Sequence, residues 1–172
     1  MIEVDTIIFA TGFDGVTGSL AQIEICGTDN RTIAEHWKDG VKTAWGIAMN
    51  KFPNMFFLYG PQAPTAFSNG PSCVQMQADW LFRLFYIIIE EKIVYWEAKG
   101  SEQEKWAGRV KEEWEKTLFP LASSWYQGAN VPSKKVEPLN WPGGMVEYRR
   151  SLDSAISPHK WFIEWSVGNG GL

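Results

Sequence analysis

One stretch near the start of the chain decides the predicted fold: Val4-Asp5-Thr6-Ile7-Ile8-Phe9-Ala10-Thr11-Gly12-Phe13-Asp14. Ile7, Ile8 and Phe9 form a β-branched and aromatic run, which predicts a strand buried on both faces in the middle of an α/β sheet. Gly12 ends the run where the backbone must turn sharply or let another group approach closely. Ligands of α/β sheets bind at the carboxyl ends of such strands, so Gly12 is a candidate site residue. A core strand followed by a loop glycine is the plainer alternative.

The composition is that of an ordinary soluble domain. The chain has 172 residues, of which 45% are hydrophobic and 21% charged, and it carries a net charge of −4. This charge does not favour nucleic acid or an anionic membrane as a partner. The longest apolar run, Leu84 to Ile89, is far shorter than the roughly 20 residues of a membrane-spanning helix. Two cysteines make no disulfide framework, and we expect a cytoplasmic protein without a signal peptide.

A second informative stretch runs from Phe52 to Lys92. Residues 56–59 predict a short buried strand, and a loop rich in Pro, Ser and Asn follows it. A helix is predicted from about Ser72 to Lys92, although Ile87–Ile89 would also suit a strand. Because a helix N-terminus carries partial positive charge and free N–H groups, residues 70–72 are a candidate site for an anion or an electron-rich carbonyl. A helix start capped by solvent is the alternative.

Shorter elements are predicted on either side of this stretch. Leu20–Ile25 is expected to form an edge strand, and Thr32 with Glu35 is a possible capping box of a short helix. A helix over residues 101–120 is expected to start with a second capping box, Ser101 with Glu104, and to bury one stripe of apolar side chains. That stripe consists of Trp106, Val110, Trp114 and Leu118. Residues 123–134 form a Gly/Pro loop whose Trp-Tyr pair offers an indole N–H and a flat face to a ligand.

Three of these stretches resemble motifs of class B flavin monooxygenases, the group that contains the Baeyer–Villiger monooxygenases. Residues 5–13 are similar to the family's "ATG" segment, and residues 51–64 to its "FPNLF…GP.SP" segment. Residues 125–134 resemble its "WYxGANVPGK" segment almost letter for letter, departing at Ser133, where a glycine is usual. The resemblance covers nearly the whole chain.

The resemblance implies a fold, a reaction and two cofactors. The expected fold is the α/β carboxyl-terminal part of a flavoprotein with two dinucleotide-binding domains, built from few strands, packed helices and long loops. Residues 1–172 are taken as one segment, with the strand at 1–14, the strand–loop–helix unit at 52–92, the helix at 101–120 and the NADPH-closing loop region at 123–150. The implied reaction converts a small ketone to an ester or lactone with O₂, using FAD and NADPH.

The resemblance also implies roles for individual residues. Gly70 stands where many relatives carry a larger apolar residue, so pocket size stays open. The residues implied to bind cofactor are Thr11, Gly12, Ser68, Asn69, Gly70, Trp125, Asn130 and Lys134. Those implied to contact substrate are Thr65, Ala66 and Phe67. No catalytic residue and no metal ligand is implied.

No G-x-G-x-x-G occurs in the sequence, so it contains no phosphate-cradling fingerprint for either nucleotide. We therefore expect the chain to be inactive alone and to need a missing amino-terminal FAD-domain half. The alternative is a non-catalytic binding or assembly module, which complements a separate FAD-domain chain or binds a hydrophobic ligand through its many tryptophans. An unpaired central strand also predicts self-association at an open sheet edge.

Overall fold

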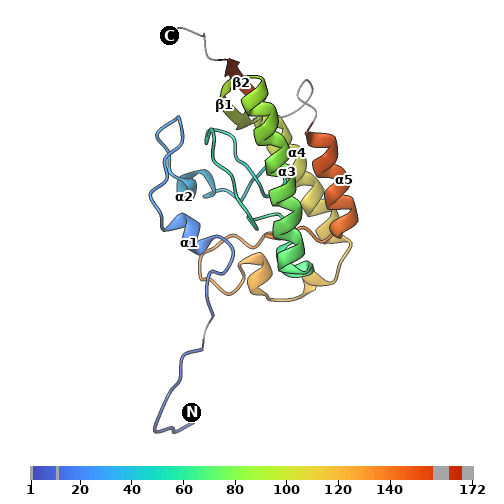
Figure 1. Cartoon of the computed structure of the whole chain (residues 1–172). Helices are drawn as coiled ribbons and strands as arrows, with labels where there is room; N and C mark the ends of the chain where they lie inside the picture. Colours follow the sequence, from blue (N-terminus) through green and yellow to red (C-terminus); the bar gives the residue numbers. More distant parts are fainter. Residues whose placement is uncertain (1, 11, 157–162, 168–172) are drawn as a thin grey trace.

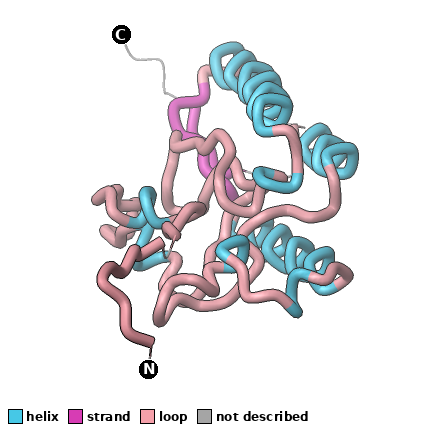
Figure 2. The backbone as a smooth tube through the Cα atoms, turned by 90° about the horizontal axis from the view of Figure 1, so that it is seen from below, coloured by secondary structure: helices cyan, strands magenta, loops and turns pink. Residues whose placement is uncertain are grey.

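The computed structural model describes residues 2–10, 12–156 and 163–167. Long loops connect short and medium helices and one pair of strands (Figures 1 and 2). The helices are α1 (Gly18–Ala21), α2 (Ile33–His36), α3 (Gly70–Glu90), α4 (Gly100–Glu115) and α5 (Met145–Ala155). The strands are β1 (Ile93–Ala98) and β2 (Ile163–Val167), and single 3-10 turns lie at Thr65–Phe67, Phe119–Leu121 and Trp125–Gln127. The expectation of few strands with packed helices and long loops is confirmed.

The main core lies where α3, α4 and α5 meet β1 and the loop around residue 45. Trp80 of α3, Trp106 of α4 and Tyr148 of α5 are all buried there. Trp106 stacks on Trp141, with ring centroids 4.7 Å apart, and on Trp45, at 5.6 Å. Offset aromatic stacking adds about 0.5–1.5 kcal/mol per pair to the stabilisation from burial. Much of the tryptophan content of the sequence is therefore core.

Helix α3 forms largely as the sequence predicts. The Asn69 side chain accepts a hydrogen bond from the Ser72 N–H at 3.1 Å, and Pro71 stands in the first turn. Its buried face includes Cys73, Trp80, Leu81 and Leu84 at helical spacing. The predicted bounds, Ser72 to Lys92, lie two residues late at each end. Residues 87–89, which also suited a strand, are helical.

The strand pair β1 and β2 was not predicted from the sequence. The two strands run antiparallel, with Ile93 opposite Val167 and Ala98 opposite Ile163. On the other side of β1, Asn54 bonds to the strand: its N–H donates to the Trp96 carbonyl at 2.8 Å, and its side-chain oxygen accepts from the Trp96 N–H at 3.0 Å. A loop residue thus pairs with an edge that would otherwise stay open.

Three predicted strands are wrong within the described residues. Ile7, Ile8 and Phe9 form no strand: they are 67, 86 and 84% exposed, on an extended arm that leads away from the body (Figure 1). A central strand needs neighbouring strands on both sides, and no described segment of the chain lies beside residues 7–9 to supply one. Residues 56–59 form an irregular segment in which Tyr59 has a φ of 62°. Helix α1 and a turn replace the edge strand expected over Leu20–Ile25.

The two predicted capping boxes have different outcomes. The first is confirmed: Thr32 accepts from the Glu35 N–H, and Glu35 accepts from the Thr32 N–H. The second is wrong, because α4 starts after Lys99 without a side-chain cap, and Glu104 instead pairs with Lys42 at 2.5 Å. The stripe of α4 is buried at Trp106, Val110 and Trp114 as predicted, but Leu118 lies beyond the helix and is exposed.

Candidate functional site

Two neighbouring cavities lie where the N-terminal segment meets the loop of residues 123–134. The larger is an open cleft of about 520 Å³, lined by Ala10, Gly12, Phe13, Gly15, Ser123, Ser124, Trp125 and Asn130. The smaller has about 140 Å³ and is lined by Gly15, Val16, Tyr59, Thr65, Trp125 and Asn140. Gly15 and Trp125 line both cavities. The three stretches that resemble family motifs, residues 5–13, 51–64 and 125–134, therefore all contribute residues to this pair of cavities.

Trp125 contributes to the lining of both cavities. It starts a 3-10 turn that the Ser124 hydroxyl caps by accepting from the Tyr126 N–H at 3.2 Å. The turn ends at Gly128, whose φ of 75° is a left-handed conformation that favours glycine. Trp125 is 43% exposed, and a Cβ at Gly15 would lie 3.4 Å from its ring. The indole thus presents a flat face to the cleft while packing against the N-terminal segment.

Two further residues of the loop bond to the N-terminal segment. The Asn130 side-chain N–H donates to the Phe13 carbonyl at 3.0 Å, whereas the Asn130 amide oxygen is buried without a hydrogen-bond partner. The Lys134 ammonium lies 2.5 Å from a carboxylate oxygen of Asp14 and 2.5 Å from the Thr17 hydroxyl. Burial raises the pKa of Asp14, but hydrogen bonding and the charge of Lys134, with help from Thr17, outweigh it and hold the pKa below its usual value.

The predicted substrate loop is held mainly by contacts within the protein. Thr65 is buried and its hydroxyl donates to the Asn140 amide oxygen. The Ser68 hydroxyl donates to the Thr65 carbonyl at 3.1 Å. The Phe67 ring lies in an aromatic cluster, with centroids 4.6 Å from Phe119, 5.2 Å from Tyr126 and 6.0 Å from Trp114. Ala66 lies between Thr65 and Phe67 in the same 3-10 turn.

The start of α3 is capped by the protein rather than open to an anion. Pro71 has no N–H, and the Ser72 N–H and hydroxyl both donate to Asn69. The Asn69 side chain, rather than solvent, therefore caps this helix start, and the Ser72 N–H is not free for an anion. Next to them, a Cβ at Gly70 would lie 3.2 Å from the Tyr59 hydroxyl oxygen, so Tyr59 occupies space that a larger side chain would need.

The structure brings together only part of the predicted site. Gly12, Trp125 and Asn130 line the larger cleft, Thr65 joins Trp125 in the smaller cavity, and Lys134 lies beside them. Other predicted residues line neither cavity: Phe67, Ser68, Asn69 and Gly70. Thr11 lies outside the described residues. Several lining residues were not predicted as site residues, among them Tyr59, Ser123 and Asn140. Ser123 begins the predicted loop of residues 123–134, two residues before the Trp-Tyr pair, but no sequence signal distinguishes Tyr59 from a core tyrosine.

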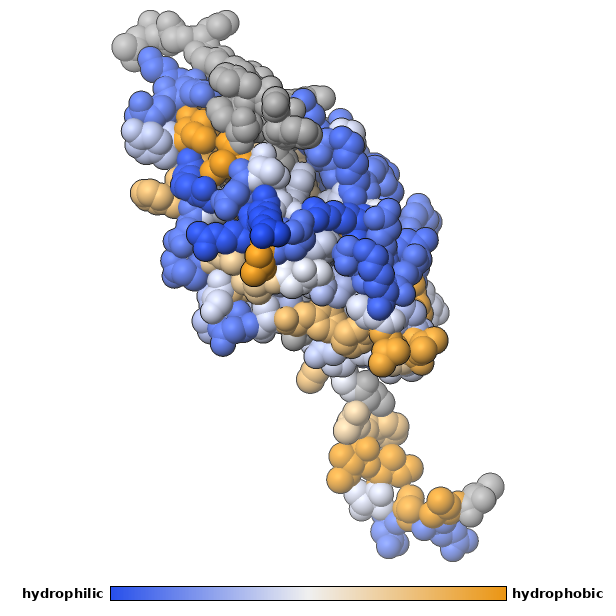
Figure 3. All heavy atoms as spheres, turned by 90° about the vertical axis from the view of Figure 1, so that its right-hand side faces the viewer, coloured by the Kyte–Doolittle hydropathy of each residue, from blue (hydrophilic) through white to orange (hydrophobic). Residues whose placement is uncertain are grey.

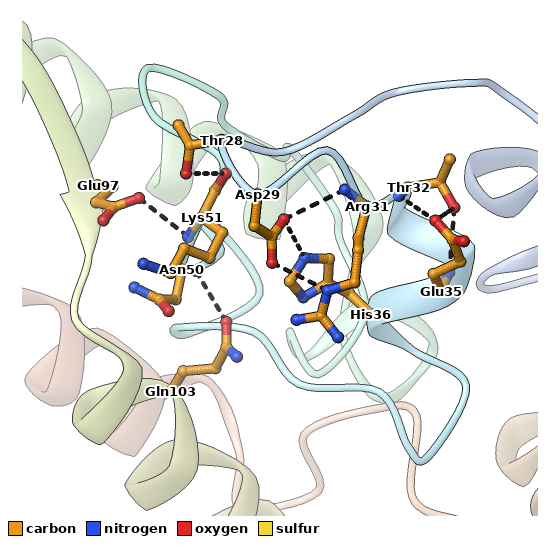
Figure 4. Close-up of polar contacts among 10 residues, drawn as sticks. All are labelled: Thr28, Asp29, Arg31, Thr32, Glu35, His36, Asn50, Lys51, Glu97 and Gln103. Atoms are coloured by element: carbon orange, nitrogen blue, oxygen red, sulfur yellow. Dashed lines mark hydrogen bonds and ion pairs between the residues drawn. The ribbon is translucent and has the colours of Figure 1, made fainter.

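A separate polar cluster stabilises the segment of residues 27–37, which includes α2 (Figure 4). His36 Nε2 lies 3.1 Å from one oxygen of Asp29, and the Arg31 guanidinium lies 3.0 Å from the other. The hydrogen bond from His36, with those from Arg31, outweighs the effect of desolvation and holds the pKa of Asp29 well below its usual value. Beside this cluster, the buried Glu97 of β1 accepts from the Lys51 N–H at 3.0 Å. These contacts stabilise a loop and line neither cavity.

Comparison with known proteins supports the resemblance, although no family model matches. The chain is 44% identical over 146 residues to cyclopentanone 1,2-monooxygenase of Comamonas sp., covering 85% of this chain and 26% of that protein. It is 36% identical over 148 residues to cyclohexanone 1,2-monooxygenase of Acinetobacter sp., covering 86% and 27%. Among solved structures, cyclohexanone monooxygenase from Rhodococcus sp. Phi1 bound to NADP⁺ matches with a TM-score of 0.88 at 32% identity, covering 96% and 31%.

The match is to one part of these proteins. A structure of OTEMO in complex with FAD and NADP also matches, with a TM-score of 0.83 at 31% identity, and the match covers 96% of this chain and 30% of that one. The chain thus spans about a quarter to a third of the length of the relatives it matches. Within the described residues, no helix has the length and hydrophobicity needed to cross a membrane. In sequence and in fold, the chain matches the carboxyl-terminal part of Baeyer–Villiger monooxygenases, which confirms the family indicated by its motifs.

Proposed function

We propose that this chain is the carboxyl-terminal part of an FAD- and NADPH-dependent monooxygenase that converts a small ketone to an ester or lactone with O₂. One observation carries the proposal: segments from three motifs, far apart in sequence, line the same pair of cavities. The names of its relatives support the substrate class, because they act on cyclopentanone, cyclohexanone and acetone.

The residues of the larger cleft suit one end of the nicotinamide cofactor. Trp125 supplies an exposed flat face, and the buried, unpartnered amide oxygen of Asn130 can accept a hydrogen bond from a carboxamide. None of the described residues that line the cleft is an arginine or lysine, and Lys134 beside it is already paired with Asp14. The phosphates of the cofactor therefore need cations from another part of the enzyme.

The chemistry of the reaction comes from the two cofactors, which supply the reducing equivalents and activate O₂ when bound. The proposed part of this chain is to bind, orient and exclude water. In this proposal Trp125 and Asn130 hold the nicotinamide end, Thr65 lines the smaller cavity beside them, and the loop of residues 123–134 covers the cleft. Because the sequence contains no G-x-G-x-x-G fingerprint for either nucleotide, we expect the chain to have no turnover of its own.

The exposed arm favours a second candidate, an assembly module without catalytic residues. Residues 2–9 carry a mostly hydrophobic sequence that extends below the body and is covered by no described part of the chain (Figure 3). An extended apolar segment with unpaired backbone groups is suited to add as a strand to the sheet of another chain. In this candidate the arm docks onto a separate FAD-domain chain, or onto a second copy.

The purified chain tests both candidates. We expect it to retain no flavin absorbance after FAD is added and the excess removed, and to consume no NADPH with cyclopentanone. It should bind, on a sizing column, to the part of cyclopentanone monooxygenase that it does not match, and the mixture should oxidise the ketone. Binding without oxidation favours the assembly module. NADPH-dependent lactone formation by the chain alone would overturn the proposed division of roles.

A further inference from the structure

Lys134 joins two segments that are 120 residues apart in sequence. Its ammonium lies 2.5 Å from both the Asp14 carboxylate and the Thr17 hydroxyl. Exposed ion pairs contribute little to stability, but here the Lys134 side chain is only 16% exposed and that of Asp14 only 29%. Partial exclusion of water and a third polar partner make this contact stronger than an ordinary surface pair.

Each partner of the contact packs over a glycine, where a larger side chain would take its place. The Asp14 side chain accepts from Thr17 at 3.1 Å and folds back over Gly18, where a Cβ would lie 2.6 Å from the Asp14 Cβ. The aliphatic stem of Lys134 crosses Gly128, where a Cβ would lie 3.0 Å from the Lys134 Cδ. A larger residue at either position would displace one partner.

The contact fixes the Trp125 wall of the cleft. The residue after Asp14 is Gly15, which lies beside the Trp125 ring: an added Cβ there would be 3.4 Å from the ring. On the other side of Asp14, the Phe13 carbonyl accepts the hydrogen bond from Asn130. By fixing Asp14, the contact with Lys134 also fixes its neighbours Phe13 and Gly15, which place the loop of residues 123–134 against the N-terminal segment.

We propose that Lys134, Asp14 and Thr17 form a latch that sets the width of the cleft, with Lys134 as a positioning residue for Trp125. When the latch is released, the loop carrying Trp125 moves away from Gly15 and the cleft widens. The role of this cleft in cofactor binding rests on the proposed function, whereas the latch itself does not.

The latch predicts a local change on removal of the Lys134 charge. The protein is labelled with 5-fluorotryptophan, and the ¹⁹F NMR resonance of Trp125 is assigned as the one that disappears in Trp125→Phe. Lys134→Met should shift and sharpen this resonance, while the resonances of the core tryptophans stay in place. Amide hydrogen exchange over residues 12–21 should rise severalfold. Lys135→Met is the matched control, because Lys135 contacts the Asp39 carbonyl and Glu137 rather than the N-terminal segment. It should change neither readout.

Asp14→Asn provides a second route should Lys134→Met not fold. It should reproduce the effect, and the double variant should show no larger change than either single one, since each removes the same contact. A Trp125 resonance and an exchange rate that stay as in the wild type in both single variants would overturn the latch, as would an equal effect of Lys135→Met.

Titration of the wild-type chain with NADP⁺ separates the latch from the proposed function. The same titration is made with a chimera in which this chain replaces the matching part of a relative. If the Trp125 resonance responds to Lys134→Met but not to NADP⁺ in either protein, the latch is supported and the cofactor role of the cleft is refuted. If the resonance responds to NADP⁺ but not to Lys134→Met, the latch is refuted and the cofactor role stands.

Discussion

Replacing Tyr148 by phenylalanine should destabilise the protein by about 2–4 kcal/mol. Tyr148 is fully buried on α5, and its hydroxyl donates to the Trp45 carbonyl at 2.6 Å and accepts from the Gln77 side chain at 2.7 Å. Gln77 is itself completely buried on α3, and its amide oxygen accepts from the Tyr59 N–H at 2.7 Å. One hydroxyl thus links two helices to the wall of the smaller cavity.

The magnitude follows from the two bonds that are lost. Each of the two buried partners that loses its hydrogen bond costs about 1–2 kcal/mol, in the lower part of the range for an unsatisfied buried polar group, which gives about 2–4 kcal/mol for the two. Phenylalanine fills nearly the same volume, so little is added for a cavity. Burial raises the pKa of Tyr148 far above its usual value, despite the opposing hydrogen bond from Gln77, so the phenol stays protonated and the loss should not vary with pH from 6 to 9.

Urea unfolding followed by circular dichroism measures this loss. With a slope of roughly 2 kcal/mol per molar urea, Tyr148→Phe should lower the midpoint by about 1–2 M. Tyr86→Phe is the matched control, because Tyr86 lies on α3 with 63% of its surface exposed, and it should change the free energy of unfolding by less than about 0.5 kcal/mol. A Tyr148→Phe variant as stable as this control would refute the reasoning.

Other predictions concern the loop of residues 123–134 and its contact with the N-terminal segment. Ser133 has a φ of 66°, so Ser133→Gly should relieve left-handed strain and, after the added entropy of the unfolded chain, stabilise by roughly 0.5 kcal/mol in urea unfolding. Gly128→Ala should do the reverse, lowering stability by about 1–2 kcal/mol, because φ is 75° and the new Cβ meets Lys134. The lowered pKa of Asp14 means that its ion pair stabilises the fold above about pH 4 and that this contribution is lost as the pH falls through the folded-state pKa. The stability difference between the wild type and Asp14→Asn should therefore shrink below pH 4; a constant difference would show that the charge of Asp14 is unimportant.

Local signals predicted the elements that depend on neighbouring residues. Helix α3 was predicted over Ser72 to Lys92 and forms over Gly70–Glu90, and the buried stripe of α4 follows from the spacing of Trp106, Val110 and Trp114. Both rest on interactions within a few turns, which the sequence displays directly. Leu118 fits the same spacing but lies after the helix has ended, where its side chain has no core to enter.

Elements that depend on distant partners were not predictable in this way. Ile7–Phe9 reads as a buried strand, yet no described residue of this chain pairs with it. β1 follows α3 almost without a break, and its partner β2 lies some 65 residues further on, so the sequence pattern alone does not reveal the pair. The contact between Lys134 and Asp14 joins residues 120 positions apart, so no local spacing of residues predicts it either. The motifs indicated which segments to compare, and the structure shows which of their side chains line the two cavities.

The most direct test of the central claim replaces the matching part of Comamonas cyclopentanone monooxygenase with this chain. We predict that the chimera retains FAD and oxidises cyclopentanone, cyclohexanone or acetone in a reaction that requires NADPH and O₂. Trp125→Ala in the chimera should abolish most of this activity, while Val136→Ala, at an exposed position of the same region, should not. A chimera that retains FAD but oxidises none of these ketones, or that retains no FAD at all, would contradict the claim that this chain completes the site of a Baeyer–Villiger-type monooxygenase.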